Sequence, residues 1–137
     1  MKYAAAYAAT ALVMVVLDLL WLGVIARPLY QHGIGHLMLE RPNVPVAVLF
    51  YAVFALGLVV FAVLPTAADP GWTRTALWAA LFGFFAYATY DLTNLATLKG
   101  WPVGLSLIDM AWGSAVSAVS GVAGKLAFDL FLPRAPA

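Results

Sequence analysis

The sequence has no cysteine, so its 137 residues can form no disulfide, no thiolate metal site and no thiol nucleophile. Charged side chains are also scarce. They make up 9% of the chain, against about 25% of an ordinary soluble domain. The formal net charge is only +1. Because a nucleic-acid-binding surface is strongly basic, we expect no nucleic-acid partner.

Apolar residues fill the chain instead, at 65% of the sequence. So small a domain cannot hide this much apolar surface from water, and membrane lipid is therefore its expected solvent and partner. Continuous hydrophobic runs of about 20 residues predict helices, which satisfy their own backbone in lipid. The predicted fold is an all-α polytopic membrane protein, a single domain over residues 1–137 whose four transmembrane helices form a bundle. The predicted spans are residues 4–26, 44–64, 75–98 and 103–123.

Proline and charge indicate where these spans end and which way they run. Arg27-Pro28 ends the first span, and the residues up to Pro45 form a short interfacial segment between the first two helices. The basic residues divide four to three between the two sides, which by the positive-inside rule places both termini in the cytoplasm. The terminal side has Lys2, Arg74, Lys125 and Arg134, and the other side has Arg27, Arg41 and Lys99.

Three of the six acidic residues, Asp18, Asp91 and Asp109, fall inside predicted spans. A charged residue at the centre of a membrane helix costs roughly 2.5–3.5 kcal/mol on insertion scales and marks function by default. Counted from the helix ends at 1.5 Å per residue, all three lie roughly 9–12 Å below the same face of the membrane. We therefore predict that three helices bring their carboxyl groups to one depth.

Aromatic and polar side chains share helix faces with these acids. Trp21 follows Asp18 by three residues and Trp112 follows Asp109 by three, which places each pair on one face. The third helix has a further face formed by Tyr87, Asp91 and Asn94. The predicted ligand- or proton-binding residues are Asp18, Asp91, Asp109, Asn94, Tyr87, Trp21 and Trp112.

Small residues line the fourth span beside Asp109, at Gly113, Ser117 and Gly121. Small side chains let helices approach closely in lipid, so this face is expected to pack inward or against a second copy in a homodimer.

Three converging carboxyl groups cannot all be ionised, because like charges repel and lipid does not solvate them. No Lys or Arg lies in the middle of any span to compensate them. A proton, a metal cation or a cationic ligand must do so, and the sequence does not identify a cofactor.

The segment between the first two spans offers a second candidate. His32, His36 and Glu40 are spaced four residues apart, so on one continuous helix they would share a face and could bind a metal ion. Gly33 and Gly35 weaken the helix, and the alternative interpretation is the polar face of an interfacial helix.

Several motifs resemble those of a known family. They are Y-D-L-T-N-L-A-T at residues 90–97, K-G-W-P at 99–102, D-L-L-W at 18–21 and D-M-A-W-G at 109–113. The chain resembles, over nearly its whole length, an uncharacterised family of small four-helix bacterial inner-membrane proteins, classed as a domain of unknown function. The resemblance implies a multi-pass protein of the bacterial inner membrane and transfers no catalytic residue.

Three functions remain open at this stage. The first is proton- or cation-linked transport or binding of a small molecule or lipid at the carboxyl groups. The second is an intramembrane enzyme acting on a lipid or isoprenoid, with paired carboxylates as acid and base or as ligands of a divalent metal. The third is an accessory subunit of a membrane complex, whose acids would pair with a partner's basic residues.

Overall fold

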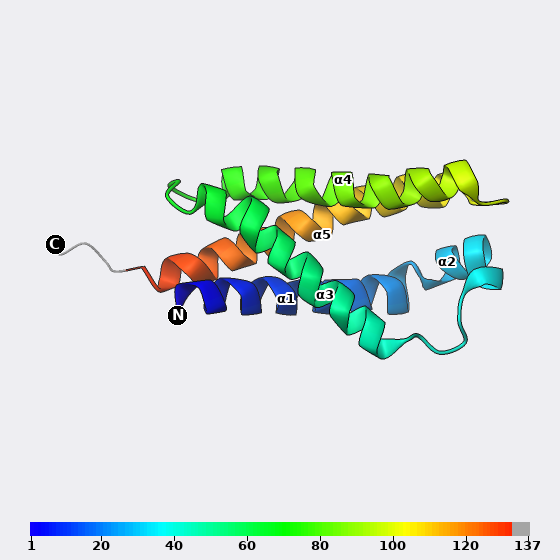
Figure 1. Ribbon diagram of the computed structural model, residues 1–137, viewed down its shortest axis with the longest axis horizontal. Helices are drawn as coiled ribbons and strands as arrows, with labels where there is room; N and C mark the ends of the chain where they lie inside the picture. The colour runs from blue at the N-terminus through cyan, green and yellow to red at the C-terminus, as the bar shows by residue number, and fades with distance from the viewer. Residues whose placement is uncertain (133–137) are drawn as a thin grey trace.

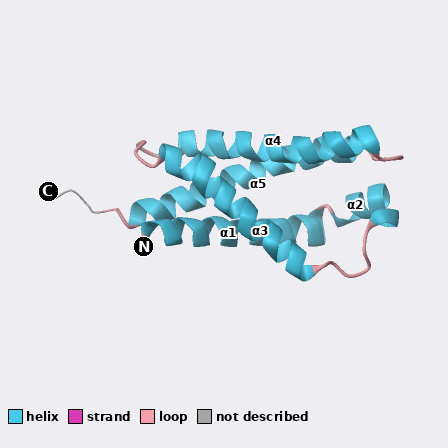
Figure 2. Ribbon diagram, viewed as in Figure 1, coloured by secondary structure: helices cyan, strands magenta, loops and turns pink. Residues whose placement is uncertain are grey.

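A computed structural model describes residues 1–132, which form helices and the turns between them without a β-strand (Figures 1 and 2). Arg134, one of the basic residues counted on the terminal side, lies outside the described residues. The helical elements are α1 (Lys2–Leu20), η1 (Trp21–Ile25), α2 (Arg27–Ile34), η2 (Gly35–Leu37), α3 (Val44–Leu58), η3 (Val59–Val63), η4 (Leu64–Thr66), α4 (Thr73–Thr97) and α5 (Val103–Leu130).

Three continuous helical stretches in this part of the chain are long and apolar enough to cross a membrane. They are Lys2–Ile25, Val44–Thr66 and Val103–Leu130. The last runs seven residues beyond the predicted span, and its C-terminal turns bury Lys125 and Phe128 against other parts of the chain. The first ends in a π-helical turn, η1, and the second contains one, η3, before its final 3₁₀ turn η4; each π-helical turn accommodates one extra residue without breaking the helix.

The α4 helix is as long as the others, but its composition is more polar. Much of that polarity is satisfied within the helix. The hydroxyl groups of Thr89, Thr93 and Thr97 each donate to the carbonyl oxygen four residues earlier, at 2.5–2.7 Å. This threonine stripe therefore consists of hydroxyl groups already bonded to their own helix.

The helices α4 and α5 run antiparallel and side by side, α1 packs along α5, and α3 crosses over α1 at an oblique angle (Figure 1). The N-terminus lies at the end of the molecule opposite α2. A core of Met14, Phe54, Leu58, Ala79 and Val116 joins the four long helices.

Small residues hold α4 and α5 at close range. A Cβ added at Gly83 would strike the Gly113 carbonyl oxygen and Ser117, and one added at Gly121 would strike Ala79. The predicted small-residue face of α5 therefore packs within the chain, against α4. Each step of four residues forward along α4 meets a step of four residues back along α5, and the next step in this register brings Asp91 opposite Asp109.

The segment between α1 and α3 differs from its predicted form. The first span ends at Ile25, just before Arg27-Pro28 as predicted, and Pro28 occupies the first turn of the separate helix α2, where its missing N–H is not needed. α2 ends at Ile34, and Met38 is already extended. The expectation that His32, His36 and Glu40 share one helical face is therefore wrong: the three fall on α2, on η2 and beyond both, and all are exposed.

The other end of the molecule has an ion pair formed by a buried lysine. Lys125, only 2% exposed, donates to Asp129 Oδ1 at 2.8 Å and to the Ala67 carbonyl oxygen at 3.0 Å. This lysine lies inside α5, so its charge is compensated within the protein. It therefore gives less support to the predicted orientation than a free loop lysine would.

Candidate functional site

Asp18 is buried near the end of α1, and both of its oxygens are hydrogen-bonded. Trp112 on α5 donates its indole N–H to Oδ1 at 2.8 Å, and Tyr51 on α3 donates its hydroxyl to Oδ2 at 2.9 Å. The side chain is only 3% exposed. One carboxyl group therefore ties three helices together, and its lone pairs are satisfied as a carboxylate.

Asp109 on α5 has, among the residues that the structure describes, a single donor, the hydroxyl of Tyr30 on α2. Burial, followed by this hydrogen bond, raises the pKa of Tyr30 above its usual value, so the phenol keeps its proton and remains a donor. The Tyr30 oxygen in turn lies 3.5 Å from Trp21 Nε1. The indole of Trp21 stacks on that of Trp112 with ring centroids 4.4 Å apart and planes 4° from parallel. This stack joins the environments of Asp18 and Asp109.

Asp91 on α4 has no donor at all. It is 1% exposed, and both carboxyl oxygens are buried without a hydrogen-bond partner among the described residues. The register of the α4–α5 contact places it opposite Asp109, and the two carboxyl groups are close neighbours. Two carboxylates offer only acceptors, so a proton or another cation is required for this pair to be satisfied.

A cavity of about 500 Å³, which we call the acidic cavity, opens beside these groups. Asp18 and Asp109 line it, and no Lys, Arg or His within residues 1–132 does. Aliphatic side chains complete a wall that is mostly aromatic, formed by Tyr30, Phe50, Tyr51, Phe54, Tyr87, Tyr90 and Trp112. The cavity is thus an apolar, aromatic chamber with two acidic groups and no fixed positive charge.

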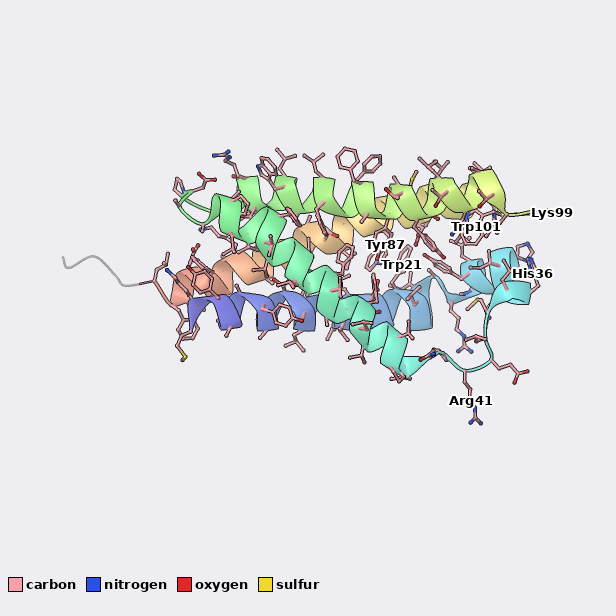
Figure 3. All side chains as sticks on the ribbon, viewed as in Figure 1. Trp21, His36, Arg41, Tyr87, Lys99 and Trp101 are labelled. Atoms are coloured by element: carbon pink, nitrogen blue, oxygen red, sulfur yellow. The ribbon has the colours of Figure 1, made fainter. Side chains whose placement is uncertain are left out.

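The structure brings four of the seven predicted site residues to the wall of the acidic cavity. Asp18, Asp109, Trp112 and Tyr87 line the acidic cavity, and the Tyr87 ring packs against the Gly113 backbone. The other three predicted residues are not in the wall: Asp91 lies behind Asp109, between α4 and α5, Trp21 stacks behind Trp112, and Asn94 is half-buried further along α4. Figure 3 shows Tyr87 and Trp21 pointing toward the space between the helices.

Sequence reasoning missed the tyrosines that complete the site. Tyr30 was not predicted because it lies in the segment between spans, and nothing in the sequence shows that α2 folds back over Asp109. Tyr51 falls near the start of α3, but its pairing with Asp18 depends on the oblique crossing of α3 over α1. The only available signal was general: both residues are aromatic and lie toward the same end of the molecule as the acids.

No group of three His, Cys, Asp or Glu side chains within residues 1–132 is arranged to hold a metal ion. His36 points outward at the end of the molecule (Figure 3). The carboxyl groups of the acidic cavity are instead arranged around hydrogen-bond donors from Trp and Tyr.

The fold and this site define a class, that of multi-pass helical membrane proteins with carboxyl groups buried between the helices. The chain belongs to the family described as "Predicted membrane protein (DUF2177)", whose model matches residues 3–126. The match covers all three acids and every residue of the acidic cavity wall. No curated protein and no solved structure matches the chain.

Proposed function

We propose that the acidic cavity binds a lipophilic organic cation in exchange for a proton. The observation that carries the proposal is the Asp91–Asp109 pair, buried and facing each other, with a single donor from Tyr30 between them. Without a bound cation the pair must hold a proton. A cation that reaches Asp109 removes that need, and the proton leaves.

The aromatic wall supports a cationic ligand over a neutral one. Tyr and Trp rings present a negative face, and a cation over such a face is stabilised by about 2 kcal/mol or more when water is excluded. Seven aromatic residues surround the cavity, and the charges available inside it are those of Asp18 and Asp109. The mostly apolar wall would hold the rest of an amphiphilic ligand.

The membrane topology is part of the proposal. In it, α4 crosses the membrane beside α5, in a bacterial inner membrane with both termini in the cytoplasm. At about 1.5 Å per residue, its 25 residues are long enough for a hydrocarbon core of about 30 Å. Its threonine hydroxyls are bonded to its own backbone and Asp91 faces α5, so the surface that α4 offers to lipid is less polar than its composition.

Binding of tetraphenylphosphonium to purified protein in detergent, measured by equilibrium dialysis between pH 6 and pH 8, tests this function. We expect affinity to rise with pH, and about one proton to be released per cation bound in weakly buffered solution. Asp109→Asn removes the charge and should weaken binding at least about tenfold. Asp91→Asn supplies an amide donor in place of the proton, so binding should become independent of pH.

Asp69→Asn is the matched control, because Asp69 forms a surface ion pair with Arg74 far from the acidic cavity. It should bind the cation as the wild-type protein does. Binding that is insensitive to pH in the wild type, or equal in Asp109→Asn and Asp69→Asn, would overturn the proposal.

A further inference from the structure

A groove of about 920 Å³ runs between α1 and α3 on the outside of the helices. The two helices cross and then diverge toward the end of the molecule that contains α2 (Figure 1). The Tyr7 hydroxyl donates to the Ala52 carbonyl oxygen at 3.0 Å and joins the helices where the groove narrows. Apolar side chains of α1 and α3, among them Val15, Leu19 and Val48, form its sides. We call this feature the α1–α3 groove.

The wide end of the groove is polar. Arg27, Gln31 and Glu40 line it there, at the level where the long helices end. The ion pairs within residues 1–132 are Arg74–Asp69 and Lys125–Asp129, so Arg27 and Glu40 have no salt bridge of their own. An apolar trough thus ends in one positive and one negative side chain, both free to bind a ligand.

We propose that the α1–α3 groove binds a phospholipid with a phosphoethanolamine headgroup. Arg27 and Gln31 donate to the phosphate, which suits the planar guanidinium, and Glu40 accepts from the primary ammonium group. An acyl chain lies against Val15, Leu19 and Val48. The charge pattern selects this lipid: an anionic headgroup leaves Glu40 unpaired, and a choline headgroup has no N–H to donate to it.

The groove touches the acidic cavity, because Leu22, Tyr30, Ala47 and Tyr51 line both. Tyr30 and Tyr51 are also the donors to Asp109 and Asp18. The lipid therefore lies directly against the residues that orient the two carboxyl groups. The proposal does not require the cavity to bind a cation, so either can fail alone.

Native mass spectrometry of the detergent-solubilised protein, titrated with phosphatidylethanolamine, phosphatidylcholine and phosphatidylglycerol of identical acyl chains, tests the site. We expect phosphatidylethanolamine to bind most tightly. Arg27→Gln should weaken its binding about tenfold, the cost of losing a charge-assisted hydrogen bond. Glu40→Gln should abolish the preference for ethanolamine over choline while leaving phosphatidylcholine binding unchanged.

Arg41→Gln is the matched control for charge, because Arg41 belongs to the same segment but does not line the groove and projects away from the helices (Figure 3). Val48→Trp fills the groove and should reduce binding of all three lipids. Val53→Trp, on the same helix but outside the groove, should not. Equal affinity for the ethanolamine and choline lipids in the wild type, or equal losses in Arg27→Gln and Arg41→Gln, would overturn the assignment.

Discussion

The three buried carboxyl groups differ in the donors that each one has. Asp18 accepts from Trp112 and Tyr51, Asp109 accepts from Tyr30 alone, and Asp91 accepts from none. A buried acceptor without a donor costs more than a hydrogen bond gains, so the fold keeps Asp91 only if something else pairs with it. This difference in the number of hydrogen-bond donors favours a structural role for Asp18, which holds the helices together, and proton exchange at the Asp91–Asp109 pair.

Tyr30→Phe tests the link between α2 and Asp109. Removing the hydroxyl should lower the free energy of unfolding by about 1–2 kcal/mol near neutral pH. Because the pKa of Tyr30 is raised in the folded protein, its contribution is complete below about pH 10 and is lost as the pH rises toward the folded value. Thermal unfolding in detergent from pH 8 to pH 11 should therefore show wild type and variant converging at the alkaline end.

Tyr3→Phe provides the control for that measurement, since Tyr3 is more than half exposed and lies at the opposite end of α1. It should run parallel to the wild type at every pH. A constant gap between wild type and Tyr30→Phe up to pH 11 would contradict the assigned role of the phenol.

For single residues, the sequence predicts how deep a carboxyl group lies in the membrane but not which side chains donate hydrogen bonds to it. Counting residues from the helix ends is enough to put Asp18 and Asp109 at one level, because a helix rises by a fixed amount per residue. Which donors reach them depends on the rotation and crossing of whole helices, and so Tyr51 and Tyr30 could not be found. His32 and Glu40 show the converse error, since a spacing of four or eight residues aligns side chains only while the helix continues.

The positions of α4, α5 and α2 depend on one close helix–helix contact and on the π-helical turn η1. In the α4–α5 contact, Gly83 and Gly121 have no side chain, so the two helices approach closely there. This close approach fixes the register that sets Asp91 opposite Asp109. The turn η1 begins three residues after Asp18, directly at the end of α1, and such turns are frequent at functional sites. A one-residue insertion rotates everything after it, so η1 helps to direct α2, and with it Tyr30, toward Asp109.

Gly83→Ala tests the α4–α5 register. The added methyl group would meet the Gly113 carbonyl oxygen, which is backbone and cannot move aside cheaply. We expect a loss of about 1–3 kcal/mol in stability and a matching loss of tetraphenylphosphonium binding, because the two carboxyl groups would no longer align. Thermal unfolding and equilibrium dialysis on the same preparation measure both effects.

Gly104→Ala is the matched glycine, with open space around the new methyl group in the first turn of α5. It should leave binding unchanged and raise stability by up to about 1 kcal/mol, since alanine favours the helix. Equal behaviour of the two alanine variants would mean that the close contact does not control the site.

Across the whole molecule, polar groups divide between the inside and the two ends. The buried acids lie near the end that contains α2, the buried Lys125, paired with Asp129, lies near the other, and long apolar side chains cover the outside between them. Composition was enough to predict a helical membrane protein, because so high an apolar fraction has no soluble alternative. It could not decide whether α4 crosses, since α4 packs its polar residues against α5 or bonds them to its own backbone.

The absence of cysteine gives a direct measurement of that crossing. Ala68→Cys and Lys99→Cys introduce single thiols at exposed positions on either side of α4, and Tyr3→Cys adds one near the N-terminus. We expect a membrane-impermeant maleimide to label Ala68→Cys and Tyr3→Cys in inverted vesicles and Lys99→Cys in right-side-out vesicles. Labelling of Ala68→Cys and Lys99→Cys from the same side would show that α4 does not cross. Asp91 would then lie outside the bilayer, where water could solvate it and its pairing with Asp109 would no longer require a proton or a bound cation.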